Sequence, residues 1–173
     1  MDDRRLHGFT LLELLVTLGV IGVLVSAGVP ALQHSIQGAR LRAAAQAVAT
    51  DLRYARAEAV RLNHRLFLSF RLQSPRDWCY AVSDHPDCGC ANACPSTAAA
   101  ARTTTSSVDY PGVSLLRARF SRAATTAFSP LRGLARAGHI SLQVDDGRTL
   151  TVVLSPLGRV RICSDNFTGY PPC

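Results

Sequence analysis

The apolar run from Phe9 to Val29 constrains this chain more than any other stretch. Glu13 is its only charged residue, and Pro30 follows it directly. Helical residues rise about 1.5 Å each, so the run extends for roughly 31 Å, enough to cross a bilayer core. A carboxylate inside such a segment is unfavourable in lipid and needs a specific partner. Cleavage between Gly8 and Phe9 would supply one, because the new amine would lie one helical turn from Glu13.

The stretch Gly8-Phe9-Thr10-Leu11-Leu12-Glu13 follows a short charged leader and opens the apolar run. It resembles the class III signal of type IV pilins and pseudopilins. The resemblance implies that a prepilin peptidase cleaves after Gly8 and methylates the amine of Phe9. It also implies that Glu13 guides the packing of the helix into a filament, with Pro30 at the twenty-second mature position. The alternative is a plain signal anchor or a secretory signal removed after residues 26–28, but neither explains the motif.

The order of segments predicts one anchored α+β domain. We expect a leader over residues 1–8, a transmembrane and assembly helix over residues 9–30, and an amphipathic continuation of that helix over residues 31–65. Residues 66–173 then form a β-rich domain, which is long enough for one modest core. In the pilin fold that the resemblance implies, the long kinked helix packs on an antiparallel sheet. The resemblance also implies a location in the inner membrane, single-pass with the C-terminal domain in the periplasm, and in the pilus after assembly.

Beyond Pro30 the apolar residues recur at helical spacing, in alternating steps of four and three. They are Leu41, Ala45, Val48, Leu52, Ala55, Ala59 and Leu62. This spacing predicts an amphipathic helix whose apolar stripe lies on a sheet. The arginines off the stripe are interpreted as a solvated helix face in preference to a ligand site. They are Arg40, Arg42, Arg53, Arg56, Arg61 and Arg65.

Two pairs of segments read as β-hairpins. Residues 66–72 and 78–82 flank a turn over residues 74–77, and residues 139–144 and 149–154 flank Asp145-Asp146-Gly147-Arg148. A further strand is expected from Gly158 to Cys163. The passage from the helix into the first strand, residues 52–63, resembles the junction of the FimT/GspH branch of minor pilins and pseudopilins.

The cysteines predict disulfides rather than a metal site. Six of them follow the apolar run: Cys79, Cys88, Cys90, Cys94, Cys163 and Cys173. A chain exported to an oxidising compartment uses such cysteines in bridges. We prefer Cys163 with Cys173 and the other four among themselves, in a loop over about residues 84–107. Zinc held by His85 with the cysteines of that loop is the alternative, and no metal or cofactor is expected.

The last predicted strand carries Gly158-Arg159-Val160-Arg161, in which strand alternation places both arginines on one face. Like charges so close together are best tolerated opposite a polyanion. The sequence resembles the motif by which FimT-type minor pilins bind DNA. Weaker DNA-binding candidates are Arg132, Arg136 and Arg148. Phe167 and Tyr170 could stack on bases, although aromatic residues of a tail more often cover the edge of their own domain. The alternative is that these arginines are solvated strand residues.

Nothing in the sequence predicts an enzyme, because no histidine stands in a nucleophile arrangement and no phosphate-binding loop is present. The resemblance implies a minor pilin of a type IV pilus that binds DNA without sequence preference during natural transformation. The alternatives are a structural GspH-like pseudopilin of a type II secretion system, or a minor pilin for assembly or adhesion without DNA binding. The expected partners are other pilins, the prepilin peptidase, the inner membrane and DNA.

Overall fold

The computed structural model describes residues 10–86, 90, 103–121 and 123–173. It separates into two compact units, Met1–Ile36 and Gln37–Cys173, and the helix α1 (Leu11–Arg61) contributes to both. The predictions for Gly8, Phe9, Cys88 and Cys94 fall outside the described residues.

The first unit consists of the N-terminal part of α1. The side-chain hydroxyl of Thr10 accepts a hydrogen bond of 3.2 Å from the backbone N–H of Glu13, which caps the helix start. Glu13 lies in the first helical turn, where a negative charge is favourable to the helix dipole. The helix continues through Pro30 without interruption. Among the described residues, no helix combines the length and the apolar character needed to cross a membrane.

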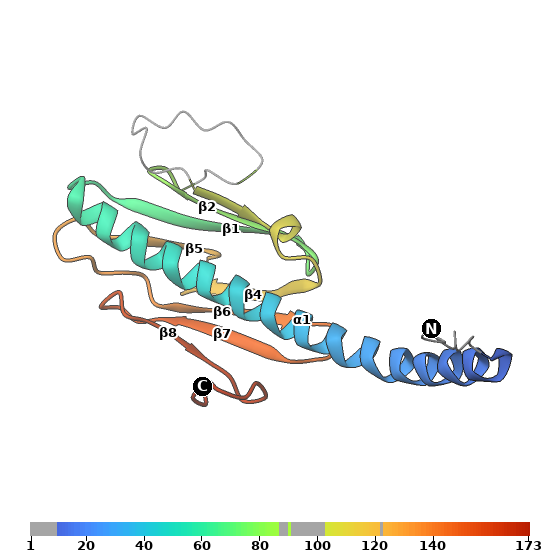
Figure 1. Ribbon diagram of the computed structural model, residues 1–173. Coiled ribbons are helices and arrows are strands. Elements are labelled where there is room, and N and C mark those ends of the chain that lie inside the picture. Colours follow the sequence, from blue (N-terminus) through green and yellow to red (C-terminus); the bar gives the residue numbers. More distant parts are fainter. Residues whose placement is uncertain (1–9, 87–89, 91–102, 122) are drawn as a thin grey trace, which may run out of the picture. The chain divides into compact units, whose positions relative to one another are not determined.

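The second unit begins with the rest of α1, whose apolar stripe is buried as predicted. Leu41, Leu52, Ala55 and Ala59 have no exposed surface, and Leu62 is half-buried at the end of the stripe. The predicted amphipathic helix is therefore confirmed over these positions. Figure 1 shows this part of α1 crossing the strands of the domain.

The strands form two four-stranded antiparallel sheets (Figure 1). The first has the order β3-β2-β1-β5 and contains β1 (Leu66–Ser74), β2 (Asp77–Ser83), β3 (Thr103–Ser106) and β5 (Thr125–Phe128). The second has the order β4-β6-β7-β8 and contains β4 (Val113–Phe120), β6 (Gly138–Val144), β7 (Thr149–Leu154) and β8 (Val160–Cys163). A 3-10 helix, η1 (Ser107–Asp109), lies between β3 and β4. Both predicted hairpins and the strand after Gly158 are present.

One core joins α1 to both sheets. The rings of Phe70 on β1 and Phe120 on β4 stack with centroids 5.9 Å apart, which links the two sheets. The indole of Trp78 on β2 is buried and donates a 2.9 Å hydrogen bond to the carbonyl of Val113. Ile140 on β6 is fully buried, so the alternate residues of that strand point away from the core. The second sheet therefore has an outer face on which polar side chains can gather.

Candidate nucleic-acid interface

A row of side chains crosses the outer face of the second sheet. Arg119 on β4 is paired with His139 on β6, His139 with Val153 on β7, and Val153 with Arg161 on β8. We call these four residues the outer-face row. Neighbouring strands lie about 4.8 Å apart, so the row is roughly 14 Å long between its two arginines. An arginine stands at each end, and a histidine stands between them.

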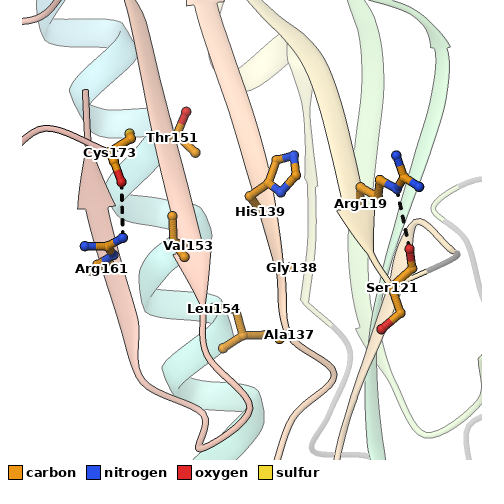
Figure 2. Close-up of a pocket in the computed structure, with 10 residues that line it drawn as sticks. All are labelled: Arg119, Ser121, Ala137, Gly138, His139, Thr151, Val153, Leu154, Arg161 and Cys173. Carbon is orange, nitrogen blue, oxygen red and sulfur yellow. Dashed lines mark hydrogen bonds between the residues drawn. The ribbon is translucent and has the colours of Figure 1, made fainter. Parts of the chain in front are cut away.

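The row lines an open hollow of about 560 Å³, shown in Figure 2. The Nε of Arg119 donates to the carbonyl of Ser121 at 3.4 Å, and Nη2 of Arg161 donates to the backbone oxygen of Cys173 at 3.4 Å. Within the described part of the chain, neither guanidinium pairs with an Asp or Glu side chain. Both arginines are exposed. These two long bonds orient the guanidinium groups. Within the described residues, no Asp or Glu side chain neutralises either charge.

Arg159 lies outside the row, in the turn before β8. Gly158 adopts a φ of +72°, and its N–H donates to the carbonyl of Ser155 at 2.9 Å, so glycine closes this turn. Arg159 lines a second hollow of about 410 Å³ together with Arg53 and Arg56 of α1. Strand alternation predicted one shared face for the two motif arginines. In the structure they line different hollows, because β8 begins only at Val160.

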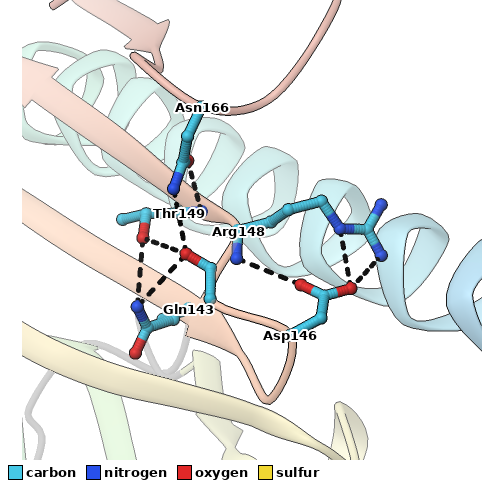
Figure 3. A network of polar contacts seen from close by, with 6 residues as sticks. Gln143, Asp146, Arg148, Thr149 and Asn166 are labelled. Atoms are coloured by element: carbon cyan, nitrogen blue, oxygen red, sulfur yellow. Dashed lines mark hydrogen bonds and ion pairs between the residues drawn. The ribbon is translucent and has the colours of Figure 1, made fainter.

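The weaker candidate Arg148 is engaged inside the protein. Its Nη2 lies 2.6 Å from Oδ2 of Asp146, and its guanidinium lies over the ring of Phe167, 5.2 Å from the centroid. Figure 3 shows this ion pair beside the hydrogen bonds that join Asn166 to the β6–β7 turn. The side chain of Phe167 is only 5% exposed and packs with the core, so Phe167 covers the edge of its own domain and is not available to stack on bases. Arg132 and Arg136 are exposed.

Two disulfides are present among the described cysteines. Cys163 is bonded to Cys173, the pairing preferred from the sequence, and Cys79 is bonded to Cys90. The first bond ties the C-terminal segment across the end of β8, beside Arg161. No group of three or more His, Cys, Asp or Glu residues in the described part of the chain is arranged to hold a metal ion.

Comparison with known proteins places this fold in a family. The family model described as type II transport protein GspH matches residues 44–158. The chain belongs to the GspH family. A second model, the prokaryotic N-terminal methylation motif, matches residues 3–29. The chain is therefore a type IV minor pilin or pseudopilin of the GspH kind, and its family implies association with other pilins.

The chain is similar to one curated protein in sequence and to one solved structure in fold. The chain is 40% identical over 57 residues to type II secretion system protein H of Xanthomonas campestris pv. campestris, a match covering 33% of this chain and 34% of that protein. The matched part thus spans about a third of that relative. The crystal structure of the type IV minor pilin FimU of Pseudomonas aeruginosa PAO1 has the same fold, with a TM-score of 0.50 and 18% identity. That match covers 70% of this chain and 87% of FimU.

Sequence reasoning did not single out Arg119 and His139 as a site. Residues 116–120 alternate between apolar and basic side chains, which is a strand signal with arginines on one face. That signal could have identified Arg119 as an outward-facing residue. Its position opposite His139 depends on the pairing of β4 with β6, which no local pattern gives.

Proposed function

We propose that this GspH-family chain is a minor pilin of a type IV pilus that binds DNA without sequence preference during natural transformation. The principal contacts are Arg161, in the outer-face row, and Arg159, in the turn that Gly158 closes. The observation that carries the proposal is the outer-face row. Its two exposed arginines, at either end of an open hollow, lack Asp or Glu partners within the described residues.

The dimensions of the row suit a nucleic-acid backbone. Duplex DNA carries one negative charge per about 1.7 Å of its axis, so roughly eight charges fall within the row's 14 Å. One guanidinium group can donate two parallel hydrogen bonds to the oxygens of a phosphate, whereas the base sequence of DNA is recognised at base edges in the grooves. A flat sheet face with arginines at its ends therefore favours backbone contacts. Affinity through such contacts is micromolar or poorer at physiological salt and falls as the salt concentration rises.

The N-terminal segment supports the assembly part of the proposal. The match to the methylation motif covers residues 3–29, within which a prepilin peptidase would cleave between Gly8 and Phe9 and methylate Phe9. The chain would then be held once across the inner membrane, with its sheets in the periplasm, until Glu13 and Pro30 direct its entry into the filament. Mass spectrometry of the mature N-terminal peptide tests this. A chain that begins at any residue other than Phe9 would contradict it.

Titration of a labelled duplex with the full chain in non-ionic detergent tests the DNA-binding part. The double variant R159Q/R161Q should lower duplex affinity at least tenfold, because two phosphate contacts are lost. The matched control R65Q/R71Q removes the same charge from two exposed positions outside both hollows. Equal affinities of the two double variants at low salt would exclude Arg159 and Arg161 as the DNA contacts.

A structural pseudopilin of a type II secretion system is the second candidate. The similarity to type II secretion system protein H over 57 residues favours it. In that case the parent chain would bind no duplex at low salt, and its crosslinks in cells would join it to secretion pseudopilins. A minor pilin for assembly or adhesion would likewise bind no duplex, but its crosslinks would join it to pilus subunits.

A further inference from the structure

Four arginines from three separate segments gather around the C-terminal half of α1. Arg53 and Arg56 belong to the helix, Arg132 to the connection between β5 and β6, and Arg159 to the turn before β8. Arg53 and Arg56 line two hollows, one of about 360 Å³ with Arg132 and one of about 410 Å³ with Arg159. We call these four residues the helix-end cluster. Arg159 lies two residues from Arg161 of the outer-face row, whereas the other three arginines are farther from the row in the sequence.

Two glycines bring the segments together around Arg56. Gly133 and Gly158 have φ values of +60° and +72°, a conformation that favours glycine. A Cβ atom added at Gly133 would come within 2.8 Å of Arg56 Nε, and one added at Gly158 within 2.7 Å. The guanidinium of Arg56 also donates to the carbonyl of Gly158 at 3.5 Å. Arg56 is therefore fitted between the two turns that carry Arg132 and Arg159.

The acidic residues of this part of α1 are occupied elsewhere. Asp51 accepts a 2.7 Å hydrogen bond from the hydroxyl of Tyr80, and Glu58 accepts one of 2.7 Å from Nε of Arg61. Within the described residues, none of the four arginines of the helix-end cluster pairs with a carboxylate. Among the residues that the structure describes, the four positive charges of the cluster thus have no ion-pair partner, and they stand at the walls of two open hollows.

We propose that the helix-end cluster is a phosphate-binding site for a nucleic-acid backbone, additional to the outer-face row. The choice of nucleic acid as the ligand rests on the proposed DNA binding. The existence of an anion site rests on the geometry of the cluster. Guanidinium groups match the oxygens of phosphate, and a phosphodiester chain carries repeated charges that several arginines can share. A single carboxylate would neutralise only one of the four.

Continuity with the outer-face row favours nucleic acid over an acidic protein. Arg159 in the cluster and Arg161 in the row are two residues apart, which corresponds to about 6.6 Å along an extended chain. The two arginines line different hollows, but β8 is an edge strand, so a backbone that contacts Arg161 could pass around this edge to Arg159 and the helix-end cluster. Exposed Leu131 and Leu157 lie one and two residues from cluster arginines in the sequence and would also suit a protein partner. The experiment includes that partner as an outcome.

The test compares R53Q/R132Q with the control R65Q/R71Q in the full chain in non-ionic detergent. Each removes two exposed arginines, and neither variant changes Arg56, whose packed side chain could affect folding. Three probes are titrated: pyrophosphate, a 30-base-pair duplex and polyglutamate. We expect R53Q/R132Q to weaken duplex binding three- to tenfold, to lower the salt slope by about 1 to 2, and to abolish pyrophosphate binding. The control should leave pyrophosphate binding unchanged and alter duplex binding less than twofold.

The outcomes separate this inference from the proposed function. Equal effects of the two double variants on pyrophosphate and duplex would overturn the helix-end site, even if the duplex binds through Arg161. Pyrophosphate binding that R53Q/R132Q abolishes, in a parent that binds no duplex, would keep the anion site and overturn its nucleic-acid ligand together with the proposed function. Binding of polyglutamate alone, lost in R53Q/R132Q, would assign the cluster to an acidic protein and overturn the inference.

Discussion

Two groups of arginines in this protein have the same charge but different neighbours. Arg42 and Arg148 lie over the ring of Phe167, at 4.9 and 5.2 Å from its centroid, and Arg148 also pairs with Asp146. Within the part of the chain that the structure describes, the hydrogen bonds of Arg119 and Arg161 go to backbone oxygens, and both arginines line an open hollow. The first group holds the C-terminal segment against the domain. The second leaves its charge for a ligand, which a count of arginines in the sequence does not reveal.

Removing the ring that holds the first group should have the largest effect. Phe167→Ala deletes a nearly buried side chain and both cation–π contacts, so the free energy of unfolding should fall by about 3 kcal/mol. Denaturant unfolding measures this. Duplex affinity at a temperature where the variant is folded should change less than twofold. A tenfold loss of affinity in the folded variant would show that the two groups are not separate.

The disulfide between Cys163 and Cys173 adjoins both groups, because it closes the segment that contains Phe167 and ends beside Arg161. Its partners are ten residues apart. Replacing both cysteines with serine should lower stability by about 2 to 3 kcal/mol in the loop-entropy model. Thermal unfolding of oxidised parent and variant gives the difference. If the bridge also orients Arg161, duplex binding should weaken in the folded variant, whereas it should not in Phe167→Ala.

Two double variants, R119Q/R161Q and R42Q/R148Q, compare the two groups of arginines directly. The first variant should lose about tenfold in duplex affinity and about 1.8 in salt slope, because two phosphate contacts disappear. Its stability should change by under about 0.5 kcal/mol, since both side chains are exposed. The second should lose about 1 to 2 kcal/mol of stability and less than twofold in affinity. The reverse pattern would contradict the assignment of the two groups.

Local sequence patterns were sufficient to predict the helix and several strands, but not to predict which strands far apart in the sequence pair with each other. Steps of four and three predicted the buried stripe of α1, and alternation around a turn predicted β6 and β7. No strand was predicted between residues 84 and 130, yet that segment contains β4, which pairs with β6 and brings Arg119 beside His139. Burial of Phe120 in the shared core accompanies that pairing. Such a contact joins residues far apart in the sequence, so periodicity cannot indicate it.

The same limit applies to the glycine and arginine motif near β8. The sequence predicted Arg159 and Arg161 as DNA contacts, and that role stays a prediction. It did not predict that Arg56 of α1 fits against Gly158, over a hundred residues away in the chain. The need for glycine at Gly158 has a structural cause in its positive φ and in this close approach. A motif residue that reads as part of a ligand site can therefore also be required by packing.

The smallest expected effect concerns Asp51, the acid that lies two residues before Arg53 on α1. Burial raises the pKa of its carboxyl above the usual 3.8, against the opposing effect of the hydrogen bond from Tyr80. The folded state therefore binds this proton more readily than the unfolded state does. Stability from this group is greatest below pH 3.8 and declines as the pH rises through the raised value.

Asp51→Asn keeps an acceptor for the hydroxyl of Tyr80 and removes the titration. We expect it to raise stability at pH 7 by less than about 1 kcal/mol and to flatten the decline that begins near pH 4. Denaturant unfolding of parent and variant from pH 3.5 to pH 7 measures both. Duplex and pyrophosphate binding should be unchanged, because Asp51 is bonded to Tyr80 and not to Arg53 or Arg56. If Asp51→Asn strengthened pyrophosphate binding severalfold, Asp51 would be a counter-ion of the helix-end cluster. The distinction between arginines that are engaged inside the protein and arginines that are available to a ligand would then not hold on α1.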